Sequence, residues 1–183
     1  NSILLRIPDD KKASYDVELI KRLYLEYQKN AVNDENVINA LKTEIGSKPI
    51  LLIAPGKTIE THRSEIDNFI LSKKPFVISL NFRPDTIKAD KVFISNAKRF
   101  SEQKFLSNVI VTSNIKSNLP TLNYASYLNN SEMYDNSVLM FLTVLTKLGI
   151  RDVYAAGLDG FRNNDNYADP TMINNAKLGE FDK

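Results

Sequence analysis

Residues 48–58 read KPILLIAPGKT, and this stretch decides the fold. Its apolar run is too short for a helix and ends at Pro-Gly, a pair that favours a turn. Continuous hydrophobicity without alternation is typical of a strand buried on both faces, as in a parallel sheet covered by helices. We therefore expect this run to be a buried strand of such a sheet.

The same apolar pattern returns along the chain. Further strands are predicted in residues 75–81, 90–96 and 108–114, with a more exposed one in 121–128 and a last buried one in 150–159 (IRDVYAAGLD). Helices are predicted between them, in residues 57–74, 97–105 and 136–149, the last being the most apolar. Strands alternating with helices predict a three-layer α/β domain, Rossmann-like, with a mostly parallel sheet.

Two helices are expected before the first strand. Residues 14–30 place apolar side chains at three- and four-residue spacing, which indicates one apolar stripe. Residues 34–46 form the second, with Asp34 as a cap and Gly46 as a stop. We predict a helical segment over residues 1–48 that links to an upstream domain, and a Rossmann-like domain over residues 49–183.

Composition limits the classes of function. The 183 residues carry 24 basic and 22 acidic side chains, a balance that favours neither a nucleic acid nor a membrane surface as partner. Without cysteine, the chain has no disulfide and no thiolate metal site. No apolar stretch approaches the roughly 18 residues of a membrane span, and residues 1–12 lack the pattern of a signal peptide. We expect a cytoplasmic protein, with this chain a piece of a longer one.

Polar residues follow every strong strand, where parallel sheets bind ligands. Gly56 allows close backbone approach, and Thr58 begins a helix whose free N–H groups suit a phosphate, with Lys57 beside it. The other strand ends carry Asn81, Asn96, the run Thr112-Ser113-Asn114, and Asp159. Each has a structural alternative: asparagine also favours turns, lysine is commonly solvated, and Gly-Lys-Thr lacks the earlier glycine of a Walker loop.

The single histidine and three late acids are weaker candidates. His62 follows the first strand, and an exposed helical position explains it better than a catalytic role. Without cysteines beside it, a zinc site is not expected. The acids Asp159, Asp165 and Asp169 could hold a hard cation through their oxygens, although a loop rich in Asn and Asp does not require one.

Residues 50–170 resemble the bacterial sialyltransferase fold and the related pterin pyrophosphokinase-like domains. The resemblance rests on ILLIAPGKTIETHRSEI, FVISLNF, KVFISNAKRF and, most specifically, DNSVLMFLTVLTKLGIRDVYAAGLDGFRNNDNYADP. That fold is Rossmann-like and binds cytidine monophosphate linked to sialic acid. The resemblance implies a nucleotide loop at Gly56 and Thr58, nucleotide contacts at Asn81 and Asn96, sugar or phosphate contacts at Asn136 and Ser137, base and ribose contacts at Gly157 and Asp159, and a phosphate contact at Tyr167.

The chain departs from that family at three places. Its loop reads Pro-Gly-Lys-Thr where the transferases carry Gly-Asn-Gly-Pro-Ser, and Phe161 stands where they keep a tyrosine hydroxyl. The transferases also have a catalytic histidine downstream, whereas no histidine follows His62 here. Glycosyl transfer needs a base for the acceptor hydroxyl, so we expect a pocket without transferase activity.

The whole chain also resembles the C-terminal domain of bacterial aldolases related to 4-hydroxy-2-oxovalerate aldolase and hydroxymethylglutaryl-CoA lyase. The stretches that carry this resemblance are IPDDKKASYDVELIKRLYLEYQ, LLIAPGKTI, VISLNF, VFISNAKRF and NSVLMFLTVLTKLG. It implies an upstream TIM barrel that holds the divalent metal and the carbon–carbon lyase chemistry, with no cofactor in this domain.

These observations lead to one main hypothesis and two alternatives. We expect an accessory domain of an aldolase-like lyase that binds a nucleotide or nucleotide-sugar at the strand ends. The first alternative is an active sialyltransferase-like or pyrophosphokinase-like enzyme, in which Tyr167, Lys57 or an acid replaces the missing histidine. The second is a structural domain for oligomerisation, in which copies of the chain would form a homo-oligomer.

Overall fold

A computed structural model describes residue 16 and residues 32–102, 108–128 and 136–159. The elements are α4 (Glu35–Ile45), β1 (Ile50–Ile53), α5 (Thr58–Thr61), α6 (Arg63–Lys73), β2 (Phe76–Leu80), β3 (Lys91–Ile94), α7 (Ala97–Glu102), β4 (Val109–Thr112), β5 (Thr121–Leu122), the 3₁₀ helix η1 (Tyr124–Tyr127), α8 (Ser137–Lys147) and β6 (Val153–Ala156). The first predicted helix, residues 14–30, lies outside the described ranges apart from residue 16.

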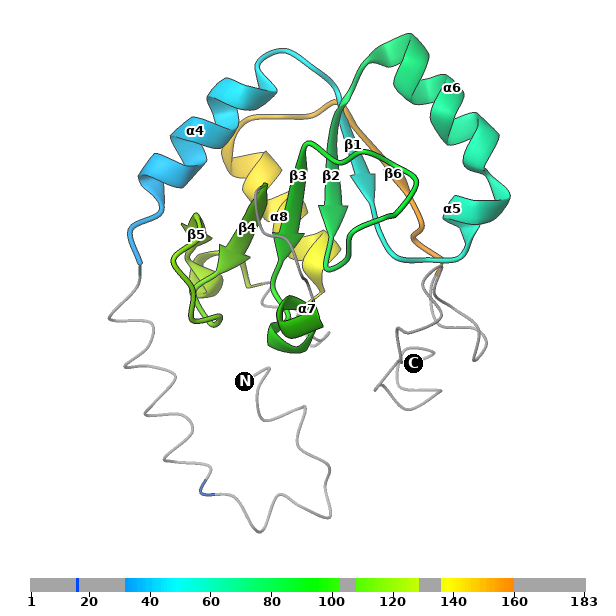
Figure 1. Cartoon of the computed structure of the whole chain (residues 1–183). Helices are drawn as coiled ribbons and strands as arrows, with labels where there is room; N and C mark the ends of the chain where they lie inside the picture. Colours follow the sequence, from blue (N-terminus) through cyan, green and yellow to red (C-terminus); the bar gives the residue numbers. More distant parts are fainter. Residues whose placement is uncertain (1–15, 17–31, 103–107, 129–135, 160–183) are drawn as a thin grey trace.

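The strands form one parallel sheet in the order β5-β4-β3-β2-β1-β6. Helices α4 and α8 cover one face, and α5 and α6 lie on the other (Figure 1). The prediction of a three-layer, Rossmann-like α/β domain is therefore confirmed. In the described part of the chain, none of the helices is long and apolar enough to cross a membrane.

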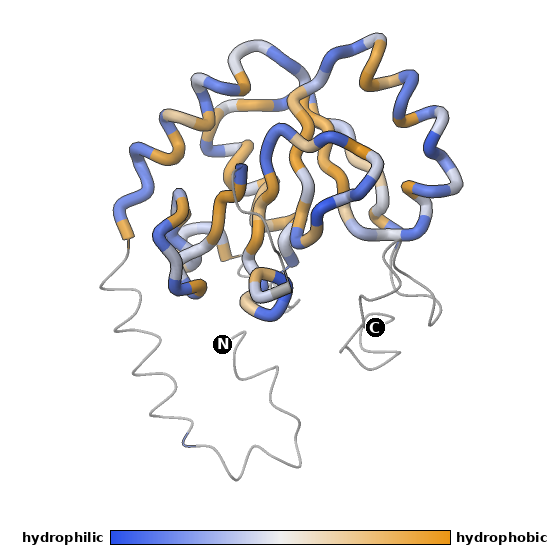
Figure 2. The backbone as a smooth tube through the Cα atoms, in the orientation of Figure 1, coloured by the Kyte–Doolittle hydropathy of each residue, from blue (hydrophilic) through white to orange (hydrophobic). Residues whose placement is uncertain are grey.

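The core divides by the alternation of side chains along each strand. On β1, Ile50 and Leu52 face α4 and α8, whereas Leu51 and Ile53 face Ile59 and Ile66 on the α5–α6 side. All four β1 residues are buried, which is why the run reads as continuously apolar. Figure 2 shows hydrophobic residues gathered in the strands, with polar residues concentrated on the outer sides of the helices.

The long predicted helix over residues 57–74 is two helices. Backbone dihedrals at His62 (φ −105°, ψ 23°) are not helical, so α5 ends and α6 begins there. The predicted strand over residues 121–128 is also largely wrong. Only Thr121–Leu122 pairs with β4, and the Asn123 side chain then caps the 3₁₀ turn by accepting from the Ala125 N–H at 3.1 Å. This turn buries Tyr124 and Tyr127, which alternation would have left on opposite faces.

The last strand differs most from its prediction. We expected a buried strand, but β6 pairs only with β1 and forms one edge of the described sheet, opposite β5. Tyr154 is 42% exposed and Ala155 is also exposed. The apolar sequence of β6 is therefore not explained by burial within the described residues.

Helix α4 is held to the far end of the sheet by a buried polar cluster. The expected cap role of Asp34 is wrong, since its side chain makes no cap bond and accepts instead from the Asn123 N–H at 2.8 Å. The cap-like bond to the Glu35 N–H comes from Asn33, at 3.0 Å. Gly46 does stop the helix, with φ of 58°. Asp34 also bonds the hydroxyl of fully buried Tyr127.

Burial, followed by the hydrogen bond and negative charge of Asp34, raises the pKa of Tyr127 above its ordinary value. The unfolded chain releases this proton near pH ~10, whereas the folded chain keeps it, so stability falls as the pH rises past that point. Wild-type protein should lose up to about 1.4 kcal/mol per pH unit there through this group. The Tyr127→Phe variant should start about 1–3 kcal/mol less stable at neutral pH and lack this alkaline loss. Urea unfolding at a series of pH values measures both, and parallel pH curves for the two proteins would contradict the assignment.

Candidate functional site

The strand order reverses between β1 and β6. From β1 the chain builds β2 to β5 on one side, and it then returns through α8 to place β6 on the other side of β1. The carboxyl ends of β1 and β6 therefore lie side by side, with the Gly56 N–H donating to the Gly157 carbonyl at 3.0 Å. Open α/β sheets bind their ligands at such a reversal. We call the segments 54–58 and 156–159 the switch point.

Two glycines make this approach possible. A Cβ on Gly56 would lie 2.3 Å from the Gly157 carbonyl oxygen, and one on Gly157 would lie 2.1 Å from the Ala54 carbonyl oxygen. Gly157 also has φ of +76°, in the left-handed region that disfavours other residues. These glycines bring two backbones together. From the sequence alone, this role could not be distinguished from close approach of the backbone to a ligand.

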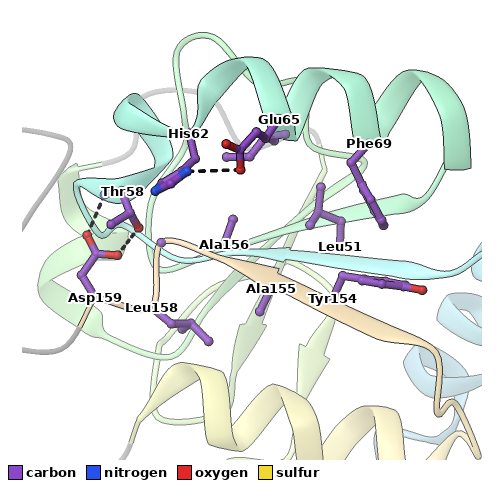
Figure 3. Close-up of a pocket in the computed structure, with 12 residues that line it drawn as sticks. Leu51, Thr58, His62, Glu65, Phe69, Tyr154, Ala155, Ala156, Leu158 and Asp159 are labelled. Atoms are coloured by element: carbon purple, nitrogen blue, oxygen red, sulfur yellow. Dashed lines mark hydrogen bonds and ion pairs between the residues drawn. The ribbon is translucent and has the colours of Figure 1, made fainter.

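Asp159 fastens the switch point through a contact between distant parts of the sequence. Its carboxylate accepts from the Thr58 N–H at 2.6 Å and from the Thr58 hydroxyl (Figure 3). Thr58 is the first residue of α5, so the acid satisfies a free N–H where a helix begins. The structure thus brings together four predicted site residues, Gly56, Thr58, Gly157 and Asp159. A fifth predicted site residue, Lys57, lies between Gly56 and Thr58 and is half-buried.

Asn81 joins the ends of neighbouring strands. It adopts a left-handed conformation, φ 59°, directly after β2. Its Oδ1 accepts from the Ser95 N–H at 2.9 Å and from the Asn96 N–H at 3.3 Å, after β3. Asn114, after β4, continues this network by donating to the Ser95 carbonyl at 3.0 Å. The strand-end amides of β2 to β4 therefore hold the carboxyl edge together.

Asn96 and Asn136 cap helices at the same edge. Asn96 Oδ1 accepts from the backbone of Lys98 and Arg99 at 2.9 and 3.2 Å, at the start of α7. Asn136 Oδ1 accepts from the Val138 N–H at 2.8 Å and caps α8, whose first residue is Ser137. Because each oxygen is committed to a cap, the orientation of each amide is set and its Nδ2 group remains a donor.

A groove of about 520 Å³ runs from the switch point between α6 and β6. The polar end contains Thr58, Asp159, and His62, whose Nδ1 lies 3.2 Å from Glu65 Oε2. The aromatic part contains Phe69 and Tyr154, whose ring centres are 4.6 Å apart (Figure 3). The nearby Asp152 carboxylate raises the pKa of the Tyr154 hydroxyl, which is protonated at neutral pH.

Sequence reasoning missed most of this groove. It placed His62 correctly as an exposed residue, with its side chain 56% accessible, but assigned none of Glu65, Phe69 and Tyr154 to a site. The spacing of Glu65 and Phe69 along α6 was visible in the sequence, whereas the contact of α6 with Tyr154 on β6 depends on strand order. Tyr167, Asp165 and Asp169 lie outside the described residues. Among the described residues, no three acids or histidines come together as a metal site.

Comparison with protein-family models, curated proteins and solved structures finds no match for this chain.

The Gly157→Ala variant should be less stable by about 3 kcal/mol or more, because its new Cβ meets backbone and its φ is strained. Gly149→Ala is a matched control: it has nearly the same φ, +75°, but nothing lies within 4 Å of the added Cβ. That change should cost roughly 1–2 kcal/mol from backbone strain alone. Urea unfolding measures the stability lost in each variant. Equal losses would show that the close approach of β1 and β6 adds nothing to the cost of backbone strain.

Proposed function

We propose that this chain is an accessory domain of an aldolase-like lyase that binds a nucleotide or nucleotide-sugar at the carboxyl edge of its sheet. The single observation that carries the proposal is the reversal of strand order at Gly56 and Gly157, because ligands of open α/β sheets bind at such points. The aldolase-like context rests on the sequence resemblance, which assigns the lyase chemistry and its metal to an upstream barrel. This domain would supply recognition of the nucleotide or nucleotide-sugar.

Donors at the carboxyl edge favour a ligand with phosphate or carbonyl oxygens. The Nδ2 groups of Asn96 and Asn136 point away from the caps that their oxygens make. Because α8 precedes a strand parallel to β1, it runs antiparallel to the sheet and begins at this same edge. Its eleven residues present a positive helix end beside the Ser137 hydroxyl. A phosphate here would meet neutral donors already held in position.

The polar groups of the switch point, and the side chain of Asn81 after β2, are largely satisfied by the protein itself. Asp159 bonds Thr58, and Asn81 bonds the backbone after β3. We therefore assign Gly56, Thr58, Asn81, Gly157 and Asp159 to shaping the pocket, and Asn96, Asn136 and Ser137 to direct contact. Because the caps already hold the Asn96 and Asn136 donors, the ligand would bind there without a large rearrangement.

Asn96→Asp and Asn136→Asp test this assignment. Aspartate still caps a helix, so both variants should fold, but each loses an amide donor and places a negative charge beside the ligand phosphate. Each should weaken binding of cytidine 5′-monophosphate by about tenfold or more, from the loss of a hydrogen bond to a charged group. Titration calorimetry measures the affinity, and cytidine without phosphate should bind both variants and wild type alike.

Asn33→Asp provides the matched control. Asn33 also accepts a backbone bond at a helix start, but it precedes α4, which contacts β5 at the opposite end of the sheet from β6. This variant should bind the nucleotide as wild type does. The proposal loses its support if neither cytidine nor purine nucleotides, free or sugar-linked, shift thermal unfolding at millimolar concentration, or if Asn33→Asp weakens binding as strongly as the other two.

His62 favours a second candidate function, glycosyl transfer. Glu65 holds one ring nitrogen at 3.2 Å, which leaves Nε2 for a substrate at the polar end of the groove. There it could take the proton of an acceptor hydroxyl while the bond between the anomeric carbon and phosphate breaks. The chain would then release cytidine monophosphate from a cytidine-sugar donor when an acceptor is present. His62→Gln should lower that rate by about 10²-fold or more, and no release from any donor would reject this candidate.

A further inference from the structure

The groove between α6 and β6 has an aromatic end that neither proposed function uses. Its volume, about 520 Å³, lies in the range of small-molecule sites, roughly 300–1,000 Å³. Leu51, Ile66, Ala155 and Ala156 give the groove apolar walls. Small-molecule sites typically combine such walls with a few polar groups that fix the orientation of the ligand. The charge and position of these polar groups therefore indicate which ligand fits.

The charged side chains of the groove are acidic. Among the described residues that line it, Glu65 and Asp159 carry carboxylates and none is a lysine or an arginine. The whole chain, by contrast, has 24 basic and 22 acidic residues. The basic neighbour Arg63 is directed elsewhere, since its guanidinium donates to Asp67 at 2.8 Å and to the Thr86 carbonyl at 2.5 Å. The groove therefore attracts a cation and repels an anion.

Glu65 is the carboxylate that a ligand can use. Asp159 already accepts from the N–H and the hydroxyl of Thr58. Within the described residues, Glu65 uses only Oε2, which lies 3.2 Å from His62 Nδ1, and its side chain is 79% exposed. An ionised carboxylate has two oxygens and about four acceptor positions. Glu65 can therefore accept from a ligand ammonium group while it keeps its contact with His62.

A pair of aromatic rings lies one helical turn from this carboxylate. Glu65 and Phe69 both project from α6 toward β6 (Figure 3). The four residues between them correspond to about 6 Å along the helix. The Phe69 ring packs against Tyr154 with 4.6 Å between ring centres, and Asp152 accepts a hydrogen bond from the Tyr154 hydroxyl. Because Tyr154 is 42% exposed, this ring pair can also contact a ligand.

We propose that this groove binds a small arylalkyl amine, in which a short alkyl chain joins an aromatic ring to a positively charged ammonium group. The ammonium group would donate to Glu65, and the ring would pack on Phe69 and Tyr154 beside the alanines of β6. Aromatic rings favour tilted contacts, which Phe69 and Tyr154 already show at 54°. This site does not rest on the nucleotide proposal, because a nucleotide carries the opposite charge.

His62 is a native reporter for the test. It is the only histidine of the chain, and it lies at the polar end of the groove. Its ring-proton signals in an NMR spectrum of the untagged chain therefore need no further assignment. Phenethylamine, titrated at constant pH, should shift these signals to saturation with a Kd of about 1 mM, an ordinary affinity for so small a ligand. Phenylpropionate, which has the same ring and the opposite charge, should bind at least about tenfold more weakly.

Glu65→Gln removes the charge and keeps an oxygen that can contact His62. This variant should weaken phenethylamine binding about three- to tenfold, as expected for a hydrogen bond to a charged group that is exposed to solvent. Glu60→Gln is the matched control, because Glu60 is also exposed but does not line the groove. It should bind the amine as wild type does.

Tyr154→Leu tests the aromatic end of the groove. Leucine keeps an apolar side chain at this partly exposed position, so the variant should fold. It should weaken phenethylamine binding about threefold or more, because one ring contact is lost. Propylamine, which has an ammonium group and no ring, should bind Tyr154→Leu and wild type alike.

Three results would overturn the proposal. The first is the absence of a saturable shift of the His62 signals with phenethylamine, which would leave the groove to a macromolecular partner. The second is equal binding of phenethylamine and phenylpropionate, which would indicate an apolar surface for another protein in place of a cation site. The third is equal binding of the amine by Glu65→Gln and Glu60→Gln, which would exclude Glu65 as its partner.

Discussion

The contact between the backbones of Gly56 and Gly157 is the constraint on which the rest of the carboxyl edge depends. Two chain segments separated by about a hundred positions in the sequence meet with no side chain between them. The Asp159 carboxylate then fastens the same place by bonding the first residue of α5. This arrangement sets where α5 starts, where β6 ends and where the groove beside α6 opens. A side chain at either glycine would push these elements apart, because the nearest atom that it would meet belongs to the backbone of the other segment.

Polar groups at this edge have two separate tasks. Asn81, Asn114 and Asp159 bond other parts of the protein, which costs them most of their capacity for a ligand. Within the described part of the chain, Asn96 and Asn136 use only their oxygens, as helix caps, and keep their amide groups as donors. A cap therefore does not compete with recognition; it orients the donor that recognition needs. This division is invisible in sequence, where all these residues follow an apolar run or precede a helix.

The sequence predicted the parts of the fold that depend on local pattern. Four buried strands, helix α8 and the stop of α4 at Gly46 follow from apolar runs, periodicity and glycine. The failures involve partners that are distant in sequence. Asp34 was expected to cap its own helix but bonds Asn123 across the domain. The apolar run of β6 indicated burial, whereas strand order places β6 at an edge. The groove was missed for the same reason, because Phe69 and Tyr154 meet only once β6 lies next to β1.

The position of β6 explains both the proposed pocket and the open edge. A strand added on the far side of β1 creates the reversal that suits a ligand, and it also becomes the last strand of the described sheet. Its two edges then have different requirements. The inner edge needs glycine so that the backbones can approach, and Gly157 meets that need. The outer edge needs either protection or a partner, and Val153 and Ala155 offer no protection. Because Gly157 directly follows β6, the pairing of β6 with β1 and the approach of the two glycines depend on the same strand.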